Sequence, residues 1–190
     1  FHNIMNAMAV CALAHHYSIE FSVLARALSE FTGICRRLQC HARVPLHGGE
    51  VLVLEDYGHH PHAIDVTLRA VKQAFPQKRL VLVFQPHRYS RTKDLLDEFS
   101  RVLVQADFLI LLDVYSAGES VQQGVTTDVL CSAMKQLSPH NMCHIDSLDA
   151  LPDFLGSIVD AGDIILLQGA GSVGSRASVI IDSIKQGVVS

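Results

Sequence analysis

The sequence predicts an α/β fold in which a mostly parallel sheet carries helices on both faces. Two observations support this prediction: apolar runs of strand length recur along the chain, and stretches with apolar residues at helical spacing separate them. Unbroken apolar strands are typical of a sheet buried on both sides, and their alternation with helices favours parallel pairing. A chain of 190 residues, 49% of them hydrophobic, is long enough for one substantial core.

The first part of the chain predicts two helices without a strand. Residues 7–14 are rich in alanine, a strong helix former. Ser18 is a suitable N-cap for a second helix, whose apolar residues fall on one face and which ends at Gly33. Two helices without a sheet indicate the end of a preceding domain. Residues 38–54 then contain two short runs around a turn, which predict a strand pair ending in the buried strand 51–54.

From residue 55 onward, helices and strands alternate to the end of the chain. Further strands are expected at 80–84, 108–112, 142–145 and 164–167. Helices are expected at 61–75, 92–105, 128–137, 148–159 and 173–185. In open sheets of this kind ligands bind beyond the carboxyl ends of the strands, so we expect functional side chains in the loops that follow them.

Composition and charge argue against several classes of protein. The net charge is −4, and the basic residues form no stripe with interleaved aromatics, so we expect no nucleic-acid partner. No apolar stretch reaches the roughly 18 residues that a membrane span needs, so we expect no membrane span. The five cysteines are odd in number and contain no C-x-x-C pair, which favours reduced thiols in a cytoplasmic protein over disulfides or zinc.

Two of the loops carry side chains suited to ligand binding. Asp56 follows the strand 51–54 and can accept hydrogen bonds from a ribose; alternatively, it caps the next helix. Arg88 and Arg91 follow the strand 80–84, and their spacing places two guanidinium forks on one turn, which suits a carboxylate or a phosphate. A solvated surface pair is the alternative for the arginines, and a non-enzymatic scaffold is the alternative for the domain.

Several chemical motifs are absent from the sequence. His59, His60 and His62 lack the helical i, i+4 pair and the companion ligands of a zinc site, so the sequence predicts no metal site. There is also no G-x-x-x-x-G-K-[ST] phosphate loop and no G-x-S-x-G nucleophile motif. This stretch of sequence therefore cannot form a Walker-type phosphate cradle by itself.

A glycine-rich turn follows the last expected strand. Gly169, Gly171 and Gly174 match G-x-G-x-x-G, which raises the alternative of an NAD(P)-binding oxidoreductase domain. Only 16 residues follow Gly174, which leaves no room for the second strand and acidic residue of a dinucleotide site. An anion held at a helix N-terminus and a tight turn that lets the helix pack closely are the other interpretations.

Six motifs occur in order along the chain. They are FHNIMNA at 1–7, GICRRL at 33–38, DYGHHP at 56–61, FQPHRYSRT at 84–92, VYSAGE at 114–119 and QGAGS at 168–172. Together they resemble the Mur ligase family of peptidoglycan synthesis, and within it the enzymes that add the first amino acid. The resemblance implies that residues 1–32 are the end of a central ATP-binding domain. Residues 33–190 would be the carboxy-terminal, amino-acid-binding Rossmann-like domain.

The resemblance also implies a reaction. A ligase of this kind uses ATP and Mg²⁺ to phosphorylate the carboxylate of UDP-N-acetylmuramate, and the amine of L-alanine then attacks the acyl phosphate. ATP and Mg²⁺ would be held mainly by the central domain, in the rest of the ligase chain. The 190-residue chain would then be a fragment, and we expect it to be inactive alone.

The family resemblance assigns roles to individual residues. The ATP site would include His2, Asn3 and Asn6 beside the adenine, Arg37 at the phosphates and Asp56 at the ribose. The alanine pocket would comprise Tyr57, His59, His87, Arg88 and Arg91. A neutral histidine, His59 or His87, or the substrate phosphate would take the proton that the amine must lose before it attacks. The sequence departs from the family at Glu55, where a second Asp is common, and at Cys35.

Overall fold

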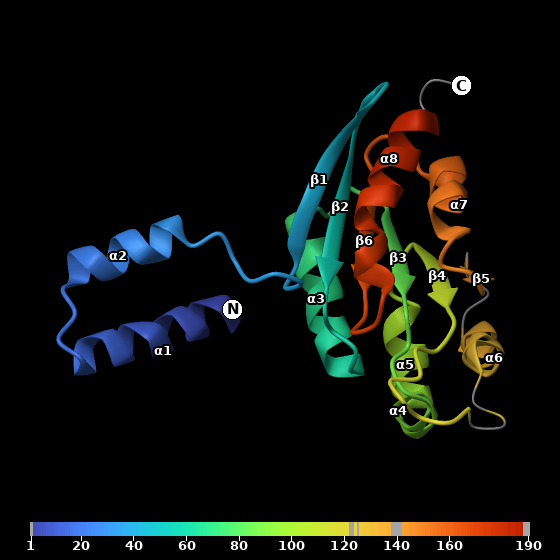
Figure 1. The fold of residues 1–190 in the computed structure, drawn as a ribbon, viewed down its shortest axis with the longest axis horizontal. Helices are drawn as coiled ribbons and strands as arrows, with labels where there is room; N and C mark the ends of the chain where they lie inside the picture. The colour runs from blue at the N-terminus through green and yellow to red at the C-terminus, as the bar shows by residue number, and fades with distance from the viewer. Residues whose placement is uncertain (1, 122–123, 125, 138–141, 188–190) are drawn as a thin grey trace. The chain divides into compact units, whose positions relative to one another are not determined.

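The computed structural model describes residues 2–121, 124, 126–137 and 142–187. The chain divides into two compact units, Phe1–Ile34 and Cys35–Ser190. The first unit consists of α1 (His2–His16) and α2 (Phe21–Glu30), so the prediction of two helices is confirmed (Figure 1).

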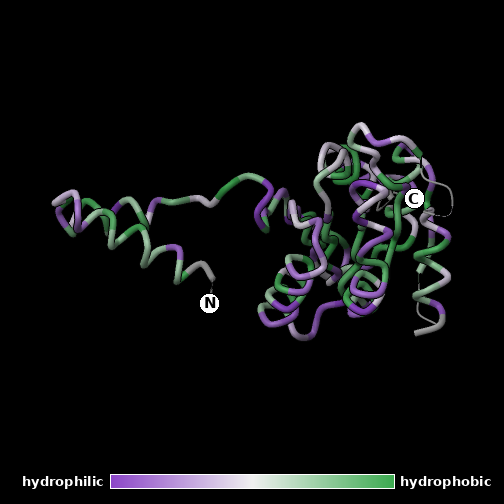
Figure 2. Tube along the Cα trace, turned by 90° about the horizontal axis from the view of Figure 1, so that it is seen from below, coloured by the Kyte–Doolittle hydropathy of each residue, from purple (hydrophilic) through white to green (hydrophobic). Residues whose placement is uncertain are grey.

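The second helix begins later than predicted because Ser18 does not cap it. Ser18 adopts a left-handed φ of 56° in the turn, and its amide donates to the carbonyl of His15 at 3.0 Å. The N-cap position is Glu20, which makes no side-chain capping bond. Within the described part of this unit only Ala14 and Leu24 are buried apolar side chains. Hydrophobic residues recur along both helices (Figure 2), and many of their side chains are exposed.

The second unit is built on a six-stranded sheet. The strands are β1 (Gln39–Leu46), β2 (Gly49–Asp56), β3 (Leu80–Phe84), β4 (Phe108–Leu112), β5 (Met142–Ile145) and β6 (Ile164–Gln168). Their order is β1-β2-β6-β3-β4-β5, with β1 antiparallel to β2 and every other pair parallel. The mostly parallel sheet of the prediction is therefore confirmed.

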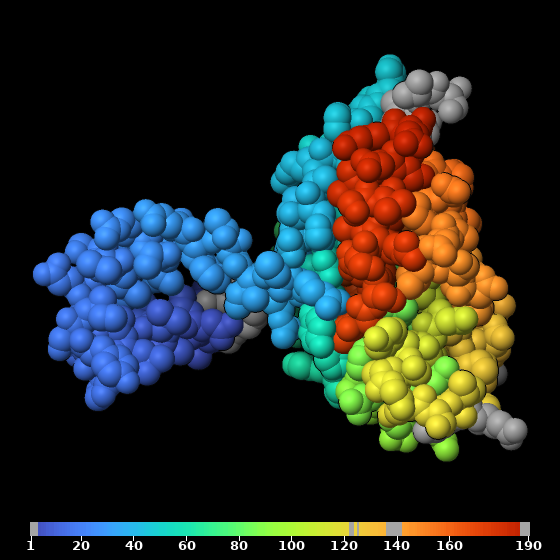
Figure 3. Space-filling model, in the orientation of Figure 1, coloured from blue at the N-terminus to red at the C-terminus, as the bar shows by residue number. Residues whose placement is uncertain are grey.

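Helices cover both faces of this sheet. One face packs against α3 (Pro61–Ala74), α5 (Leu96–Leu103) and α6 (Thr127–Leu137), and the other against α7 (Leu151–Ile158) and α8 (Ala177–Gly187). Alternate residues of each strand serve the two cores: Leu82 points to the first, and Val81 and Val83 to the second. Figure 3 shows α7 and α8 side by side on their face.

Two expected helices are interrupted. The helix expected at 92–105 begins earlier, as α4 (Tyr89–Asp94), and breaks at Leu95, whose φ of −116° and ψ of 26° lie outside the helical region. Leu95 packs against the core at this break. The closing helix begins with the 3₁₀ turn η1 (Val173–Arg176) before α8. Arg91 consequently stands on a short helix rather than in a loop.

The last strand, β6, lies between β2 and β3. Asp56 and Phe84 both pair with Gln168, so the three strands end at the same level. From β3 the chain continues to α5 on one face of the sheet, whereas from β6 it continues to α8 on the other. The edge beyond these strands is a topological switch point, the place where α/β sheets bind ligands.

The cysteines and the helix lengths were compared with the sequence-based expectations about disulfides and membrane spans. The five cysteines form no disulfide in the structure, and burial raises the pKa of Cys143 to about 11. Among the residues described, no helix combines the length and the apolar character that crossing a bilayer requires.

We expect Phe99→Ala to destabilise the fold strongly. The Phe99 side chain is fully buried between α5 and the sheet, and its ring centroid lies 5.5 Å from that of Phe84. Its truncation should lower the free energy of unfolding by about 3–5 kcal/mol, measured by chemical denaturation. Val179→Ala, at a position 47% exposed on α8, is the control and should change it by less than about 0.5 kcal/mol. Equal effects of the two variants would contradict this packing.

Candidate functional site

Side chains from three loops form a row of rings at the carboxyl edge of the sheet. This ring row consists of Tyr57 and His59 after β2, His87 after β3 and Tyr115 after β4. Ring centroids are 5.3 Å apart for Tyr57–His59, 5.6 Å for His59–His87 and 5.5 Å for His87–Tyr115. The structure therefore brings three predicted pocket residues together and adds Tyr115, which is not among the predicted site residues.

Backbone pairing beyond the strand ends holds the ring row in place. The amide of Tyr115 donates to the carbonyl of Pro86 at 2.8 Å, and the amide of Arg88 donates to the carbonyl of Tyr115 at 2.8 Å. His87 and Tyr115 thereby form an isolated parallel bridge, with their rings stacked at 24°. The pairing of β3 with β4 thus continues into both loops and fixes the two rings side by side.

The predicted arginine pair lies at the start of α4. Arg91 Nη1 donates to the carbonyl of His87 at 3.2 Å and lies 3.4 Å from His87 Nδ1. Arg88 is exposed at the N-cap position with a left-handed φ of 73°. Glu119 stabilises the first turn of α4. Its carboxylate accepts hydrogen bonds from the Ser90 hydroxyl at 2.6 Å and from the Ser90 amide at 3.0 Å. These bonds lower the pKa of Glu119.

Both histidines of the ring row have pKa values below the ordinary value for histidine. Burial lowers the pKa of His59, and the positive charge of Arg91 lowers it further, against an opposing hydrogen bond to the Tyr57 carbonyl. Burial also lowers the pKa of His87, with smaller contributions in the same direction from His59, Arg91 and Arg88. Both imidazoles can therefore accept a proton near neutral pH.

The hydrogen bonds of the histidines also determine which nitrogen accepts. His59 Nδ1 lies 3.1 Å from the carbonyl oxygen of Tyr57. Because a carbonyl only accepts hydrogen bonds, Nδ1 carries the hydrogen in the neutral ring and Nε2 keeps its lone pair. His87 Nδ1 faces Arg91, which only donates, so in His87 the hydrogen belongs on Nε2.

Asp56 points into the protein at the end of β2. Its carboxylate is 6% exposed and accepts three internal hydrogen bonds, from Gly58 N at 2.7 Å, Gln168 Nε2 at 2.9 Å and Leu38 N at 3.0 Å. The N-cap of α3 is His60, so the interpretation of Asp56 as a helix cap is wrong. A role of Asp56 in binding ribose stays a prediction.

The glycine turn, residues 169–174, is packed tightly against its neighbours. A Cβ on Gly169 would lie 2.8 Å from the Gln85 carbonyl oxygen, and one on Gly174 would collide with the carboxylate of Glu55. The amide of Val173, at the start of η1, already donates to Gln85 Oε1 at 3.1 Å. The turn therefore serves close packing, and the alternative of an NAD(P) site is not supported.

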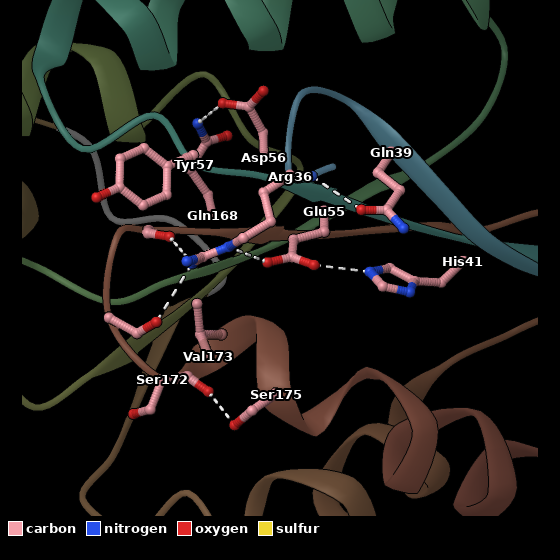
Figure 4. Close-up of polar contacts among 12 residues, drawn as sticks. Arg36, Gln39, His41, Glu55, Asp56, Tyr57, Gln168, Ser172, Val173 and Ser175 are labelled. Carbon is pink, nitrogen blue, oxygen red and sulfur yellow. Dashed lines mark hydrogen bonds and ion pairs between the residues drawn. The ribbon is translucent and has the colours of Figure 1, made fainter. Parts of the chain in front are cut away.

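An ion network around the buried carboxylate of Glu55, beside the glycine turn, was not predicted from the sequence (Figure 4). Arg36 Nε donates to Glu55 Oε1 at 2.6 Å, and Arg36 Nη2 donates to the carbonyl oxygens of Gly169 at 2.9 Å and Gly171 at 3.2 Å. His41 Nε2 lies 2.7 Å from Glu55 Oε2. The only signals in the sequence were the paired arginines at 36–37 and the unusual Glu55.

The predicted ATP-binding residues occupy different parts of the chain. Arg37 is exposed, and its Cζ lies 5.7 Å from the ring centroid of Tyr57. Asn6 is exposed on α1, in the first unit. The side chains of His2 and Asn3 lie outside the described residues. The roles of all four in binding ATP stay predictions.

Metal-ligand groups and the apolar cavity of the second unit were compared with the position of the ring row in the described residues. Within 2–121, 124, 126–137 and 142–187, no three His, Cys, Asp or Glu side chains gather as metal ligands do. An apolar cavity of about 210 Å³ lies between β1, β2 and α3, where Leu54, Val71 and Phe75 contribute to its wall. None of the rings of the row lines this cavity.

The sequence of this chain matches a known protein family and its members. A family model described as Mur ligase, glutamate ligase domain, matches residues 36–171. The chain is 43% identical over 176 residues to the UDP-N-acetylmuramate–L-alanine ligase of Psychrobacter cryohalolentis, covering 93% of this chain and 36% of that protein. It is also 43% identical over 173 residues to the ligase of the same name from Halorhodospira halophila, covering 91% and 36%.

A solved structure agrees with these sequence matches. The UDP-N-acetylmuramate-alanine ligase of Thermotoga maritima superposes with a TM-score of 0.78 at 25% sequence identity, covering 98% of this chain and 38% of that one. This chain therefore spans little more than a third of the length of the relatives that it matches.

The lowered pKa values of the two histidines predict a pH-dependent stability. Both folded-state pKa values lie below the ordinary 6.5, so below about pH 6.5 the unfolded chain binds protons that folded His59 and His87 resist. The free energy of unfolding should therefore be highest above about pH 6.5, and it should decrease as the pH falls from there through the pKa values of the folded state. We expect a His59→Gln/His87→Gln variant to lose less stability between about pH 7 and about pH 5 than the wild type. Chemical denaturation at each pH measures this; equal losses would contradict it.

Proposed function

The chain belongs to the Mur ligase family, and on that premise we propose that it is the amino-acid-binding part of an ATP-dependent ligase. This ligase would join L-alanine to UDP-N-acetylmuramate in the cytoplasm, as a step of peptidoglycan synthesis. The observation that carries the proposal is the ring row with Arg91 against His87, at the switch point of the sheet. A guanidinium group, which could hold a carboxylate, and imidazoles with lowered pKa values, which could accept a proton, lie close together there. A free amino acid requires both functions.

The proposed reaction forms one amide bond at the expense of ATP. The carboxylate of UDP-N-acetylmuramate takes the terminal phosphoryl group of ATP, which leaves ADP and an acyl phosphate. The neutral amine of L-alanine then attacks the acyl carbon, and the bond from that carbon to the phosphate oxygen breaks. The products are the amide and inorganic phosphate. The enzyme accelerates such steps mainly by positioning the reactants and stabilising their charge.

Residues of this chain would prepare the amino acid. Arg88 and Arg91 would hold the alanine carboxylate, because a guanidinium fork matches the two oxygens of a carboxylate. The alanine ammonium must lose a proton before it attacks, and Nε2 of neutral His59 is a suitable acceptor. His87 would orient the amino acid from the adjacent ring and would keep Arg91 in place.

ATP and Mg²⁺ would be held largely outside this chain. The exposed guanidinium of Arg37 suits a phosphate oxygen, and Asp56, Asn3, His2 and Asn6 would complete the nucleotide contacts by resemblance to the family. The described residues gather no metal-ligand group, so they do not fit a Mg²⁺ site. The phosphate loop and the metal ligands would belong to the rest of the ligase chain, and we expect no turnover from the 190-residue chain alone.

The function is tested directly on the full ligase that contains this chain. We expect phosphate release from ATP that depends on both UDP-N-acetylmuramate and L-alanine, measured by a colorimetric phosphate assay. Phosphate release that ignores L-alanine, or that requires a different amino acid, would contradict the proposal.

Removing the arginine pair should weaken the use of alanine. In the full ligase, Arg88→Ala and Arg91→Ala should each raise the KM for L-alanine by about tenfold or more, because each removes a charge-assisted hydrogen bond. Arg91→Ala should also lower kcat, since Arg91 contacts His87. Arg69→Ala is the control: its exposed guanidinium pairs with Asp65 on α3 and should leave both constants unchanged. Unchanged kinetics in the Arg88 and Arg91 variants would favour the scaffold alternative.

A further inference from the structure

The segment 36–38 is attached to the end of β2 by its backbone. The amide of Tyr57 donates to the Arg36 carbonyl at 2.7 Å, and the amide of Leu38 donates to the carboxylate of Asp56 at 3.0 Å. Arg36 and Leu38 both adopt left-handed conformations, with φ of 59° and 47°. Few side chains tolerate that region, so these backbone bonds must hold the segment there.

The Arg36 guanidinium joins two parts of the chain that are far apart in sequence. Its Nε donates to Glu55 at the end of β2, and its Nη2 donates to two carbonyls of the glycine turn after β6. Glu55 is 4% exposed, so its carboxylate depends on Arg36 and His41 for compensation. Gly174 of the glycine turn packs closely against the Glu55 carboxylate, so a movement of the turn away from this network would break that contact.

The same guanidinium lies against the ring row. Arg36 Cζ is 4.7 Å from the ring centroid of Tyr57, which is the distance of a cation–π contact. Tyr57 is in turn edge-on to His59. Arg37, the next residue, is exposed, whereas the hydrogen bonds to Glu55 and to the glycine turn come from Arg36. The two adjacent arginines therefore have separate environments.

We propose that Arg36 is a positioning residue that locks the glycine turn and Tyr57 in the arrangement required to bind the amino acid, while Arg37 is left free for a ligand. This inference rests on the proposed function, because its effect is read through L-alanine. A lysine cannot replace Arg36, since one ammonium cannot occupy the Nε and Nη2 positions at once. The lock therefore depends on the fork of arginine and not only on its charge.

The test compares Arg36→Lys with Arg43→Lys in the full ligase. Arg43 pairs with Glu50 at 2.6 Å on the exposed side of the β1–β2 hairpin and is the matched control. We expect Arg36→Lys to raise the KM for L-alanine by about tenfold, with the KM for UDP-N-acetylmuramate unchanged, because the defect is confined to the ring row. Arg43→Lys should change neither constant. An unchanged KM for L-alanine in Arg36→Lys, or an equal rise for both substrates, would overturn the inference.

Hydrogen exchange followed by mass spectrometry separates the lock from global stability. In Arg36→Lys, the amides of Gly169 and Val173 should exchange about tenfold faster, while those of β3 keep the wild-type rate. Equal acceleration in both segments would overturn the inference, because it would indicate general destabilisation. This readout needs no turnover, so it still tests the lock if the wild-type ligase fails to use L-alanine and the proposed function is refuted.

A charge-free double variant guards against a folding defect. Arg36→Met/Glu55→Gln removes both charges, so no uncompensated carboxylate stays buried. We expect this variant to fold and still to show the raised KM for L-alanine and the fast exchange of the glycine turn. Restoration of both to wild-type values would overturn the inference, because it would show that Arg36 serves only to neutralise Glu55.

Discussion

The arrangement of the site depends on the insertion of β6 between β2 and β3 in one register. With Gln168 paired to both Asp56 and Phe84, the loops after three strands leave the sheet at the same level. The strands are buried on both faces, so a slip of one residue would exchange the side chains that face the two layers of helices. The cores therefore fix the register, and the register fixes where the glycine turn meets β2.

The electrostatics of the edge follow from this geometry. Burial and nearby arginines lower the pKa values of His59 and His87, and the buried Glu55 carboxylate is paired with a different arginine, Arg36. Guanidinium groups and imidazoles with lowered pKa values thus lie close together at one edge of the sheet. In the proposed function the carboxylate of an amino acid must be held and its amine deprotonated, and this combination suits both tasks.

Local patterns predicted much of the fold and less of the site. The apolar runs located β3, β4 and β5 to the residue, because a buried strand has a distinctive composition. The break at Leu95 and the turn at Ser18 were missed, since each depends on packing and not on local preference. The sequence motifs predicted that Tyr57, His59 and His87 belong to one site. The hydrogen bond from Arg36 to the glycine turn joins residues 133 positions apart, and no local sequence pattern predicts such a contact.

The proposed function requires that loops from distant parts of the sequence form one amino-acid site. A crystal structure of the full ligase with L-alanine tests this most directly. We predict that the alanine carboxylate lies against Arg91 and that the alanine nitrogen lies within hydrogen-bonding distance of His59 Nε2. Alanine bound away from the ring row, or His59 and His87 separated in the complex, would contradict it.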